Sequence, residues 1–468
     1  MKRQTRRGFL KKSVVGSAGL VVLPNILTRS LFAADAPGKL IHVAQIGCGR
    51  EGRVDVEGTM AHPLARVVAV CDLDSKRAAS AQEMIANFYK KKGESEVKID
   101  AHHNYREVFA RPDIDAVIVS VPDHWHALVA SEAAIAGKHI YVQKPMTYSI
   151  AESIALRTAV RAKKVILQAG SQQRSEHPFA AFRPATEAVR NGRIGQLKTI
   201  EVGIGLDKPS GKTPAPMPVP PNLDYERWLG PAPEQPYMEG RVHPQSDFGR
   251  PGWITTEDFG LGMITNWGAH HLDIAQWGMG MELSGPSSIE GTAEFMTNDL
   301  WTVHGKYHVE MLYANGVQVI LDDKFENGLK FIGSDGWVFC SRGAVRVTSS
   351  DPNVPDAGKS SLRASDPKIL SPLPADSIRW PASSNHYLNW LESIVANRDP
   401  IAPVDQAARS LQACATAWIA MKLKRKLTWD PAKELFVNDE AANAMRDRKP
   451  RSPEYDIHRV LHEAGIRA

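Results

Sequence analysis

Cysteine is scarce in this chain, which has four cysteines among its 468 residues. Cys48, Cys71, Cys340 and Cys414 are widely separated, and no Cys-x-x-Cys pair occurs. This spacing argues against a dense disulfide framework and against the common thiol-based metal and redox motifs. Because free cysteine is among the residue types most often found in protein interiors, we expect four buried, unpaired thiols.

Long apolar runs are also missing. The apolar stretch near the N-terminus, residues 14–27, is interrupted by Gly16, Ser17 and Gly19. It is too short for a stable transmembrane helix. The hydrophobic fraction of 43% and the charged fraction of 23% are ordinary for a globular protein of two or three domains.

Acidic residues are absent from residues 1–34, which contain seven lysines and arginines. Because the whole chain carries a net charge of only +5, the remainder has a net charge of −2. The basic character therefore belongs to the N-terminus. We do not expect a nucleic-acid-binding surface.

Two adjacent arginines, Arg6 and Arg7, lie in this basic segment and are followed by Phe-Leu-Lys and the weakly apolar stretch. The pattern resembles a twin-arginine export signal. We predict that residues 1–36 are such a signal, that the twin-arginine export machinery is a partner, and that the protein is periplasmic or otherwise exported. The alternative is a basic amphipathic tail that stays on the protein.

A glycine motif follows the first predicted strand. The segment "KLIHVAQI" runs into Gly47, Gly49 and Gly52, which form G-x-G-x-x-G. In a dinucleotide-binding site such glycines permit a tight turn and a close approach of the pyrophosphate, and the amide groups of the next helix bind the phosphates. We expect these glycines, with the intervening Arg50 and Glu51, to contact a dinucleotide cofactor.

The second predicted strand, "ARVVAVCDLD", carries Asp72, 20 residues after Gly52. An acidic residue at this distance accepts hydrogen bonds from ribose hydroxyls and repels a 2′-phosphate, so Asp72 favours NAD over NADP. The alternative role of Asp72 is to cap the following helix, which Asp74 is also placed to do. Arg77, on that helix, is expected on the surface or on the adenine side.

Strands and helices alternate through the first part of the chain. The buried strand "IDAVIVSVP" precedes the predicted helix "HALVASEAAIAGK", the strand "HIYVQKP", another helix and the strand "VILQAG". This order predicts an α/β Rossmann domain with a parallel doubly wound sheet over residues 37–170. Ligands bind at the carboxyl ends of such strands, so we expect Pro122, His126 and Gln143 beside the cofactor.

The second part of the chain, residues 171–468, contains alternating segments such as "LKTIEVGIGL", "VHGKYHVEMLYA" and "GLKFIGSDG". They predict an α+β domain with a large, mostly antiparallel open sheet, suited to binding substrate and forming a homo-oligomer. The late segments "SSNHYLNWLESIVAN" and "VDQAARSLQACATAWIAMKL" predict helices that return to the body. The stretch "DKPSGKTPAPMPVPP" predicts a polyproline-like surface loop.

Several motifs together resemble the Gfo/Idh/MocA family of oxidoreductases: "IGCGREG", "CDLD", "VPDHWHA", "GKHIYVQKP" and "GMITNWGAHHLDIAQW". The resemblance runs from about residue 39 to the C-terminal segments, which are similar to an exported bacterial branch of that family. It implies a nicotinamide-dependent enzyme with Lys144 beside the nicotinamide ribose and the reacting carbinol. It does not identify the substrate.

The family pattern at this strand end is Glu-Lys-Pro, and here Gln143 replaces the glutamate before Lys144. A neighbouring carboxylate favours the protonated form of a lysine more than an amide does. We therefore predict that Lys144 loses its proton more easily than its counterpart in the family.

The segment "GLGMITNWGAHHLDIAQWGMG" predicts a helix with Asn266, His270 and Asp273 on one face. His270 is the best candidate general acid/base, because imidazole titrates near neutral pH. The resemblance implies an aspartate one turn before this histidine, and Asn266 takes its place. Asp273 is then expected to support His270. The alternative is a buried, purely structural histidine.

Residues expected around the substrate lie at the same strand ends and on the same helix. Tryptophan faces pack against sugar rings, although core packing is their commoner role. Amide and guanidinium groups donate hydrogen bonds to hydroxyls. The expected substrate residues are Trp125, Gln172, Arg174, Trp267 and His271, with Gln173 as a further donor and Trp253 and Tyr387 as further aromatic faces.

Histidines occur in "DHWH" at 123–126 and as pairs at 102–103 and 270–271. Neither HxxxH spacing nor a carboxylate triad accompanies them, so we expect no metal site. His124, Trp125 and His126 are expected instead at the edge of the cofactor and substrate cleft.

These features predict an enzyme that transfers hydride between NAD and a sugar, glycoside or polyol. His270 would take the carbinol proton, and Lys144 would stabilise negative charge on the oxygen. Because free NAD is scarce outside the cytoplasm, we expect tightly bound cofactor. Two alternatives stay open: a redox-neutral glycosidase that oxidises C3 transiently, eliminates the aglycone and adds water, and an exported sugar-binding protein without activity.

Overall fold

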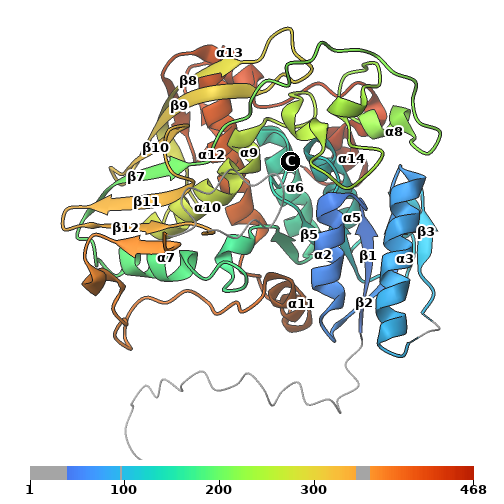
Figure 1. Ribbon diagram of the computed structural model, residues 1–468, viewed down its shortest axis with the longest axis horizontal. Coiled ribbons are helices and arrows are strands. Elements are labelled where there is room, and N and C mark those ends of the chain that lie inside the picture. Colours follow the sequence, from blue (N-terminus) through green and yellow to red (C-terminus); the bar gives the residue numbers. More distant parts are fainter. Residues whose placement is uncertain (1–39, 95–96, 344–358, 468) are drawn as a thin grey trace, which may run out of the picture. The chain divides into compact units, whose positions relative to one another are not determined.

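The computed structural model describes residues 40–94, 97–343 and 359–467, all within one compact unit, Leu40–Ala468 (Figure 1). The predicted export signal, residues 1–36, lies outside the described residues. Among the residues that are described, no helix is long and apolar enough to cross a membrane. All four cysteines are buried and free, as predicted.

Six parallel strands form the first sheet, in the order β3-β2-β1-β4-β5-β6. This order is that of dinucleotide-binding sheets, in which ligands bind where the strand order reverses, here between β1 and β4. The prediction of a parallel Rossmann sheet is confirmed. The strands are β1 (Ile41–Ile46), β2 (Ala65–Cys71), β3 (Asp100–His102), β4 (Ala116–Val119), β5 (His139–Val142) and β6 (Leu167–Ala169).

Helices cover both faces of this sheet. Apolar side chains of α2, α3 and α11 pack on one face, and those of α4, α5, α6 and α14 pack on the other. The Asp74 side chain accepts hydrogen bonds at the start of α3, and a Ser149–Glu152 capping box begins α6. These helices are α2 (Arg50–Met60), α3 (Ser75–Lys91), α4 (Tyr105–Phe109), α5 (Asp123–Ile135), α6 (Ile150–Lys163), α11 (His386–Ala396) and α14 (Ile457–Glu463).

Nine strands form the second sheet, in the order β13-β12-β11-β7-β10-β9-β8-β14-β15. β7 and β10 are paired in parallel and the other neighbours are antiparallel, so the prediction of a mostly antiparallel sheet is confirmed. The strands are β7 (Leu197–Gly203), β8 (Pro286–Phe295), β9 (His304–Tyr313), β10 (Gln318–Asp322), β11 (Gly328–Gly333), β12 (Trp337–Cys340), β13 (Leu362–Ala364), β14 (Leu427–Asp430) and β15 (Leu435–Phe436).

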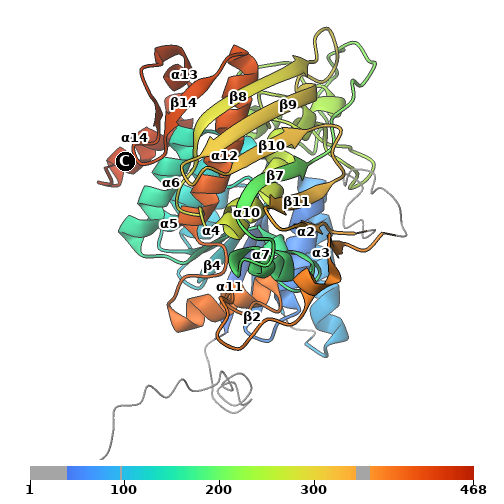
Figure 2. The same cartoon turned by 90° about the vertical axis from the view of Figure 1, so that its left-hand side faces the viewer.

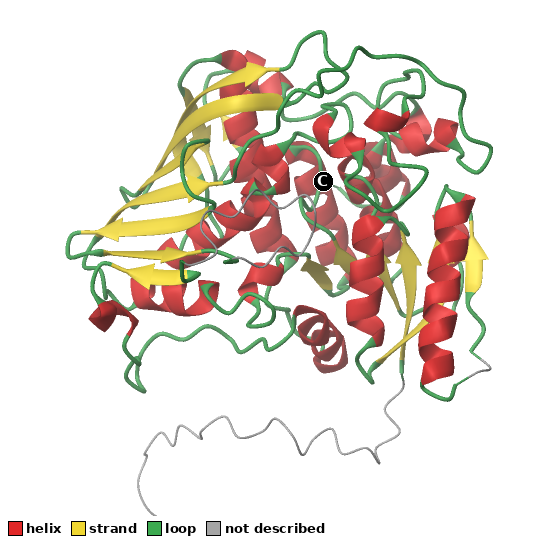
Figure 3. Ribbon diagram, viewed as in Figure 1, coloured by secondary structure: helices red, strands yellow, loops and turns green. Residues whose placement is uncertain are grey.

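Helices pack on one face of the second sheet, where α7, α10 and α12 share its apolar core (Figure 2). The segment predicted as one helix around His270 is two helices, because the chain turns at Trp267. Figure 3 shows the long loops that join β7 to α8 and α8 to α9. The remaining helices are α7 (Phe182–Arg190), α8 (Tyr225–Leu229), α9 (Met263–Asn266), α10 (Gly268–Met279), α12 (Val404–Leu423) and α13 (Glu440–Ala444).

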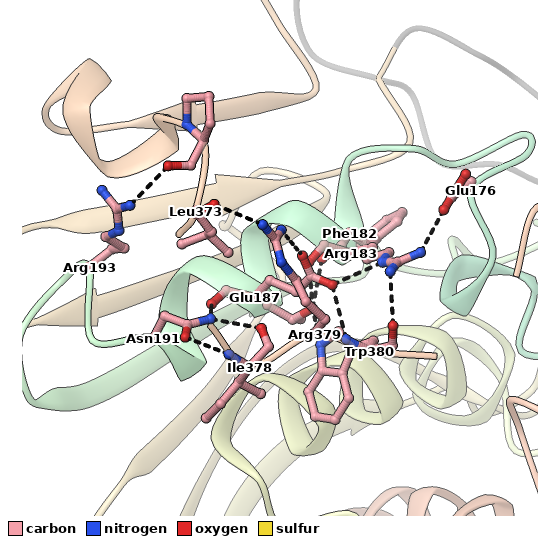
Figure 4. A network of polar contacts seen from close by, with 12 residues as sticks. Glu176, Phe182, Arg183, Glu187, Asn191, Arg193, Leu373, Ile378, Arg379 and Trp380 are labelled. Carbon is pink, nitrogen blue, oxygen red and sulfur yellow. Dashed lines mark hydrogen bonds and ion pairs between the residues drawn. The ribbon is translucent and has the colours of Figure 1, made fainter. Parts of the chain in front are cut away.

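A polar network on α7 holds the segment that leads into α11 (Figure 4). Glu187 accepts hydrogen bonds from Arg183 Nε at 2.9 Å, from an Arg379 guanidinium nitrogen at 3.0 Å and from the Trp380 backbone N–H at 3.0 Å. The Trp380 ring also stacks on Trp277 of α10, with ring centroids 4.7 Å apart. The network thereby holds in place the segment before α11, and the first residues of α11 line a cleft.

Candidate active site

A cleft of about 540 Å³ runs along the carboxyl ends of β1, β2, β4 and β5. The first part of the chain lines it with the glycine loop, Asp72, Pro122 and Lys144. The later part adds Asn266 and His270, together with residues near 243–254 and the start of α11. The cleft is therefore built by segments that are far apart in the sequence.

The glycine loop fits a diphosphate group. A Cβ atom on Gly47, where φ is +88°, would lie 2.5 Å from the Ser120 carbonyl oxygen, and one on Gly52 would lie 2.0 Å from the Gly47 oxygen. Protein packing therefore requires both glycines. A Cβ on Gly49 would meet no described atom closer than 3.9 Å, so Gly49 leaves open space beside the first turn of α2. Unpaired helix N–H groups face anions at such a position. Arg50 and Glu51 also line the cleft.

Asp72 lines the cleft at the end of β2 and is also bound to the backbone around it. One carboxylate oxygen accepts from the Cys48 N–H at 2.7 Å, and the other accepts from the Asp74 N–H at 2.8 Å. The alternative helix-capping role falls to Asp74, which accepts from the Lys76 N–H at 3.0 Å and the Arg77 N–H at 3.4 Å. These two hydrogen bonds thus fix the orientation of the Asp72 carboxyl group at the edge of the cleft.

A segment from the later part of the chain closes over this end of the cleft. Asp74, which is 2% exposed, accepts from His243 Nε2 at 3.0 Å, Asn222 Nδ2 at 2.8 Å and Gln245 Nε2 at 3.3 Å. Burial opposes ionisation of Asp74, but these hydrogen bonds and the charge of His243 outweigh it and hold the pKa well below its usual range.

Arginine stacking fastens the same segment. The guanidinium groups of Arg53 and Arg77 lie over the ring of Phe248, 4.6 Å and 4.7 Å from its centroid. Arg77 also donates to the backbone oxygens of Pro244 at 2.8 Å and Asp247 at 3.1 Å. Arg77, expected on the adenine side or the surface, is 7% exposed and holds this covering segment.

Lys144 is anchored by a residue of α9. Its Nζ donates to the side-chain oxygen of Asn266 at 2.7 Å and to the backbone oxygen of Asn266 at 3.0 Å. The shared helix face predicted Asn266 beside His270, and the structure pairs it with Lys144 instead. A neutral amide thus stands where an acid would form an ion pair with this lysine.

Gln143 connects Lys144 to a buried acid. Its amide nitrogen donates to both oxygens of Asp55, at 2.8 Å and 3.1 Å, and its amide oxygen accepts from the Lys144 backbone N–H at 3.1 Å. Asp55 also accepts from Ser120 Oγ at 2.6 Å and Tyr387 OH at 2.9 Å. Burial raises the pKa of Asp55 to about 8, although these hydrogen bonds act in the opposite direction. Asp55 could not be found from the sequence, since a single helix aspartate gives no signal.

His126 supports the chain just after Lys144. Its Nδ1 donates to the Pro145 carbonyl oxygen at 2.7 Å, and it lines the cleft with Pro122. Burial lowers the pKa of His126 to about 4, so the ring is neutral near pH 7. His124, in contrast, lies in the core with its Nε2 3.1 Å from the Trp228 carbonyl oxygen.

His270 lines the cleft, and no acidic side chain within the described residues binds it. It is 6% exposed, and its Nδ1 is buried without a hydrogen bond within the described part of the chain. Burial and the positive charges of Arg342 and Lys144 hold the pKa of His270 well below its usual value. The ring is therefore neutral, and protonating it places a third positive charge in this region.

Asp273 was expected to support His270, but it binds two other residues. Both of its oxygens bind Arg174, at 2.6 Å and 2.8 Å, and one also accepts from Ser410 Oγ at 2.7 Å. Arg174 and Asp273 are 2% and 1% exposed and are not among the residues that line the cleft. This ion pair joins the segment after β6 to α10. Asp273 and Arg174 therefore have a structural role here, and not the catalytic and substrate-binding roles that were expected of them.

The other predicted substrate residues divide into two groups. Gln172, Trp125 and Trp267 line the cleft, as do Trp253 and Tyr387. His271 lies behind it, fully buried, 3.2 Å from Asn327 Oδ1 and 3.3 Å from Gln173 Nε2. Adjacent histidines thus have different surroundings, as expected for neighbours on a helix.

Two further cleft residues had no signal of their own in the sequence. Asp123, the first residue of α5, is 5% exposed and stands out in the sequence only as part of the "DHWH" motif. Arg342 follows β12, and its guanidinium lies 4.6 Å from the centroid of Trp267 and 4.3 Å from that of Phe179. Across the described ranges, no group of three or more His, Cys, Asp or Glu residues could hold a metal ion.

Comparison with known proteins links the two parts of the chain to one family. Residues 41–171 match the model of the Gfo/Idh/MocA oxidoreductase family with an NAD-binding Rossmann fold. Residues 205–357 match the C-terminal α/β domain of the same family. Between them the two matches cover more than half of the chain.

Two curated relatives each match less than half of the chain. The uncharacterized oxidoreductase YrbE of Bacillus subtilis is 30% identical over 192 residues, which are 41% of this chain and 49% of that protein. Glycosyl hydrolase family 109 protein 2 of Shewanella sp. strain ANA-3 is 32% identical over 161 residues, which are 31% of this chain and 35% of that protein. The matched region thus spans half or less of the length of each relative.

Solved structures share the fold over most of the chain. An aldose-aldose oxidoreductase from Caulobacter crescentus, complexed with glycerol, superposes with a TM-score of 0.57 at 18% identity over 83% of this chain and 100% of that chain. The WlbA dehydrogenase from Bordetella pertussis, in complex with NADH and UDP-GlcNAcA, gives 0.57 at 15% identity over 84% and 99% of the two chains. With matches to both of its domains, this chain belongs to the Gfo/Idh/MocA oxidoreductase family.

Proposed function

We propose that this protein is a nicotinamide-dependent oxidoreductase that transfers hydride between its cofactor and a carbinol of a sugar, glycoside or polyol. The observation that carries the proposal is the position of Lys144. It lies half-buried at the end of β5, in the cleft that also contains the glycine loop and Asp72. An ammonium group stabilises negative charge that develops on a reacting oxygen.

The proposed cofactor is NAD, which supplies a hydride acceptor or donor when bound. Gly47, Gly49 and Gly52 with Arg50 and Glu51 would hold its diphosphate, and Asp72 would hold a ribose. Pro122, His126 and Gln143 would border its nicotinamide end. Preference for NAD over NADP rests on the carboxylate of Asp72, which repels a 2′-phosphate.

Lys144 and His270 are the proposed groups around the reacting carbinol. Asn266 holds the Lys144 ammonium with two oxygens, which orients it without neutralising its charge. The neutral His270 ring can accept a hydrogen bond from a hydroxyl and so orient it. Positioned acid–base groups contribute about 10²–10⁴-fold to such reactions.

Trp267, Trp125 and Gln172 are the proposed substrate contacts along the same cleft. One structural neighbour is an aldose-aldose oxidoreductase, and another was solved with a nucleotide sugar. Those properties belong to the neighbours, and they support a sugar as the substrate class here.

A direct test measures bound cofactor and transferred hydride. The purified protein should contain NAD on native mass spectrometry, and addition of aldoses should produce absorbance of NADH at the bound cofactor. Lys144→Met should bind NADH unchanged and reduce hydride transfer at least about 100-fold, within the range for loss of a charge-stabilising group. Absence of any nicotinamide binding by the wild type would contradict the proposal.

A redox-neutral glycosidase is the second candidate, because a relative named glycosyl hydrolase family 109 protein 2 matches 31% of the chain at 32% identity. Such an enzyme releases 4-nitrophenol from a 4-nitrophenyl glycoside with no net NADH. Net NADH or a reduced second sugar indicates a dehydrogenase instead. A protein that binds sugars but does neither would be the non-catalytic alternative.

Export, tight cofactor binding and homo-oligomerisation belong to the same proposal. Residues 1–36 would direct the folded, cofactor-loaded protein through the twin-arginine machinery. Replacing Arg6 and Arg7 with lysine should leave the protein in the cytoplasm, which cell fractionation detects. Sedimentation of the purified protein would test the oligomer proposed to form through the open sheet.

A further inference from the structure

Asp123 is a buried acid that faces the cleft. It is the first residue of α5, directly after Pro122, and is 5% exposed. Its carboxylate accepts no hydrogen bond from any residue in the described part of the chain. Its Oδ2 would lie 3.2 Å from a Cβ atom on Gly260, so the absence of a side chain at Gly260 leaves room beside it.

Other buried acids of this protein have donors. Asp55 accepts from Gln143, Ser120 and Tyr387, and Asp273 accepts from Arg174 and Ser410. Asp123 differs from them, because its oxygens have no donor among the described residues and yet are not among the side-chain atoms that are fully buried without a partner, so its carboxyl group reaches the open space of the cleft. An acid at the first position of a helix is common, but that role leaves the carboxylate in solvent or bonded to backbone N–H groups.

Lys144 is the charged group whose field reaches Asp123. Within the described chain the two side chains form no ion pair with each other, since Lys144 Nζ is directed to Asn266. Both groups line the cleft, and they follow the neighbouring parallel strands β4 and β5.

His270 is poorly suited to take the proton. Its Nδ1 has no acceptor within the described ranges, so no hydrogen bond from that nitrogen stabilises an imidazolium, and Arg342 and Lys144 oppose one. A base works best when its pKa is near the working pH. Burial raises the pKa of Asp123 to about 8, with Lys144 acting in the opposite direction, whereas the pKa of His270 is far below neutral.

We propose that Asp123 is the group that exchanges the carbinol proton in this site, and that His270 orients the hydroxyl. The inference rests on the proposed function. In oxidation the O–H bond breaks and its proton moves to Asp123. The C–H bond breaks and its electron pair leaves with the hydride to NAD, while a C=O bond forms beside Lys144. In reduction protonated Asp123 returns the proton to oxygen.

The test uses full-length, cofactor-loaded protein and a panel of aldoses with single-turnover detection of NADH. Asp123→Ala should reduce hydride transfer at least about 100-fold while NADH still binds, and added formate should restore a substantial part of the rate by occupying the vacated space. Asp123→Glu should retain more activity than Asp123→Asn. In the wild type the rate of oxidation should rise with pH through a limb near the Asp123 pKa of about 8, which His270→Asn should retain.

Asp55→Ala is the matched control, because it removes a second buried acid whose pKa is also about 8 but which is not among the residues that line the cleft. Formate should not restore any activity that this variant loses. The role of Asp123 is overturned if Asp123→Asn stays within about threefold of the wild type, well below the usual effect of losing an acid–base group, or if formate fails to rescue Asp123→Ala. A wild type that oxidises no aldose and cleaves no 4-nitrophenyl glycoside overturns the proposed function itself, so the two failures are distinguishable.

Discussion

The side-chain amide of Gln143 donates to Asp55 from 2.8 Å, and the two residues are 88 positions apart in the chain. The family pattern has a carboxylate at position 143, next to the lysine. Here an amide occupies that position, and the carboxyl group that it binds is that of Asp55 on α2. Glu51 also accepts from Gln143 Nε2, at 3.3 Å, so this amide is surrounded by acids.

Gln143→Glu should therefore destabilise the protein although it restores the family pattern. It would place a third carboxyl group against Asp55 and Glu51, at an expected cost of about 1–3 kcal/mol in the free energy of unfolding. The cost should grow as pH rises through about 8, because Asp55 then ionises. Urea denaturation on either side of that pH measures both effects.

The double variant Gln143→Glu with Asp55→Asn is the control for this prediction. It exchanges the amide and the carboxyl group and keeps a donor–acceptor pair between them. We expect it to recover at least about 1 kcal/mol relative to the sum of the single changes, which is typical of contacting residues. Strictly additive effects would show that the two side chains do not interact.

Lys144 should lose its proton more readily in the wild type than in Asn266→Asp. The carboxylate would lie where Oδ1 now accepts from Nζ at 2.7 Å, and an opposite charge so close shifts a pKa by about 1–3 units. NMR titration of the labelled lysine amine measures the difference, and Gln143→Glu should shift it in the same direction. Asn327→Asp, an equivalent change beside His271, should leave the Lys144 titration where it is.

Phe248→Ala should speed the release of cofactor. The ring lies against the guanidinium groups of both Arg53 and Arg77, and two such contacts contribute about 1–2 kcal/mol. We expect the dissociation rate of NADH to rise about tenfold, measured by stopped-flow fluorescence. Phe88→Ala removes a ring under Lys92, 4.5 Å from its centroid, and should not change this rate. Equal rates in wild type and Phe248→Ala would mean that the segment does not retain the cofactor.

Asp74→Asn should lower the free energy of unfolding at neutral pH. It should also make that free energy depend less on pH under acidic conditions. The pKa of Asp74 is held below its usual value, so its contribution to stability is complete above the unfolded pKa of about 3.9 and is lost as pH falls through the folded value. Removing the charge should cost about 1–3 kcal/mol above about pH 5 and less near about pH 2. Thermal unfolding across this range measures the change, and a constant difference at every pH would contradict it.

The sequence predicted what depends on local spacing. The glycine motif, Asp72 and the strand–helix alternation lie within short stretches, and each maps onto the parallel sheet and its cleft. The mostly antiparallel second sheet followed from alternating hydrophobic residues in the same way. The break at Trp267 was not predicted, because no proline marks it and an isolated glycine such as Gly268 is tolerated within a helix.

The sequence could not predict which distant side chains meet. Asn266 binds Lys144 across 122 positions, and Asp273 binds Arg174 across 99, so a shared helix face with His270 did not reveal the partners of these two side chains. Asp55 and Asp123 resemble ordinary helix acids in the sequence. Only their burial distinguishes them, and burial depends on the tertiary fold.

The contacts around Asp74 have a consequence for protein engineering. Backbone hydrogen bonds join the Ser75 N–H to the Asn222 oxygen at 2.9 Å and the Asp224 N–H to the Leu73 oxygen at 3.0 Å, next to the side-chain network of Asp74. These hydrogen bonds join the later part of the chain to the edge of the first sheet, at the point where the adenosine of a cofactor would lie. A chimera that joins a foreign Rossmann half to this substrate half would lack Asp74 and leave its partners Asn222, His243 and Gln245 without this acceptor, so cofactor specificity has to be changed within the chain rather than by exchanging modules.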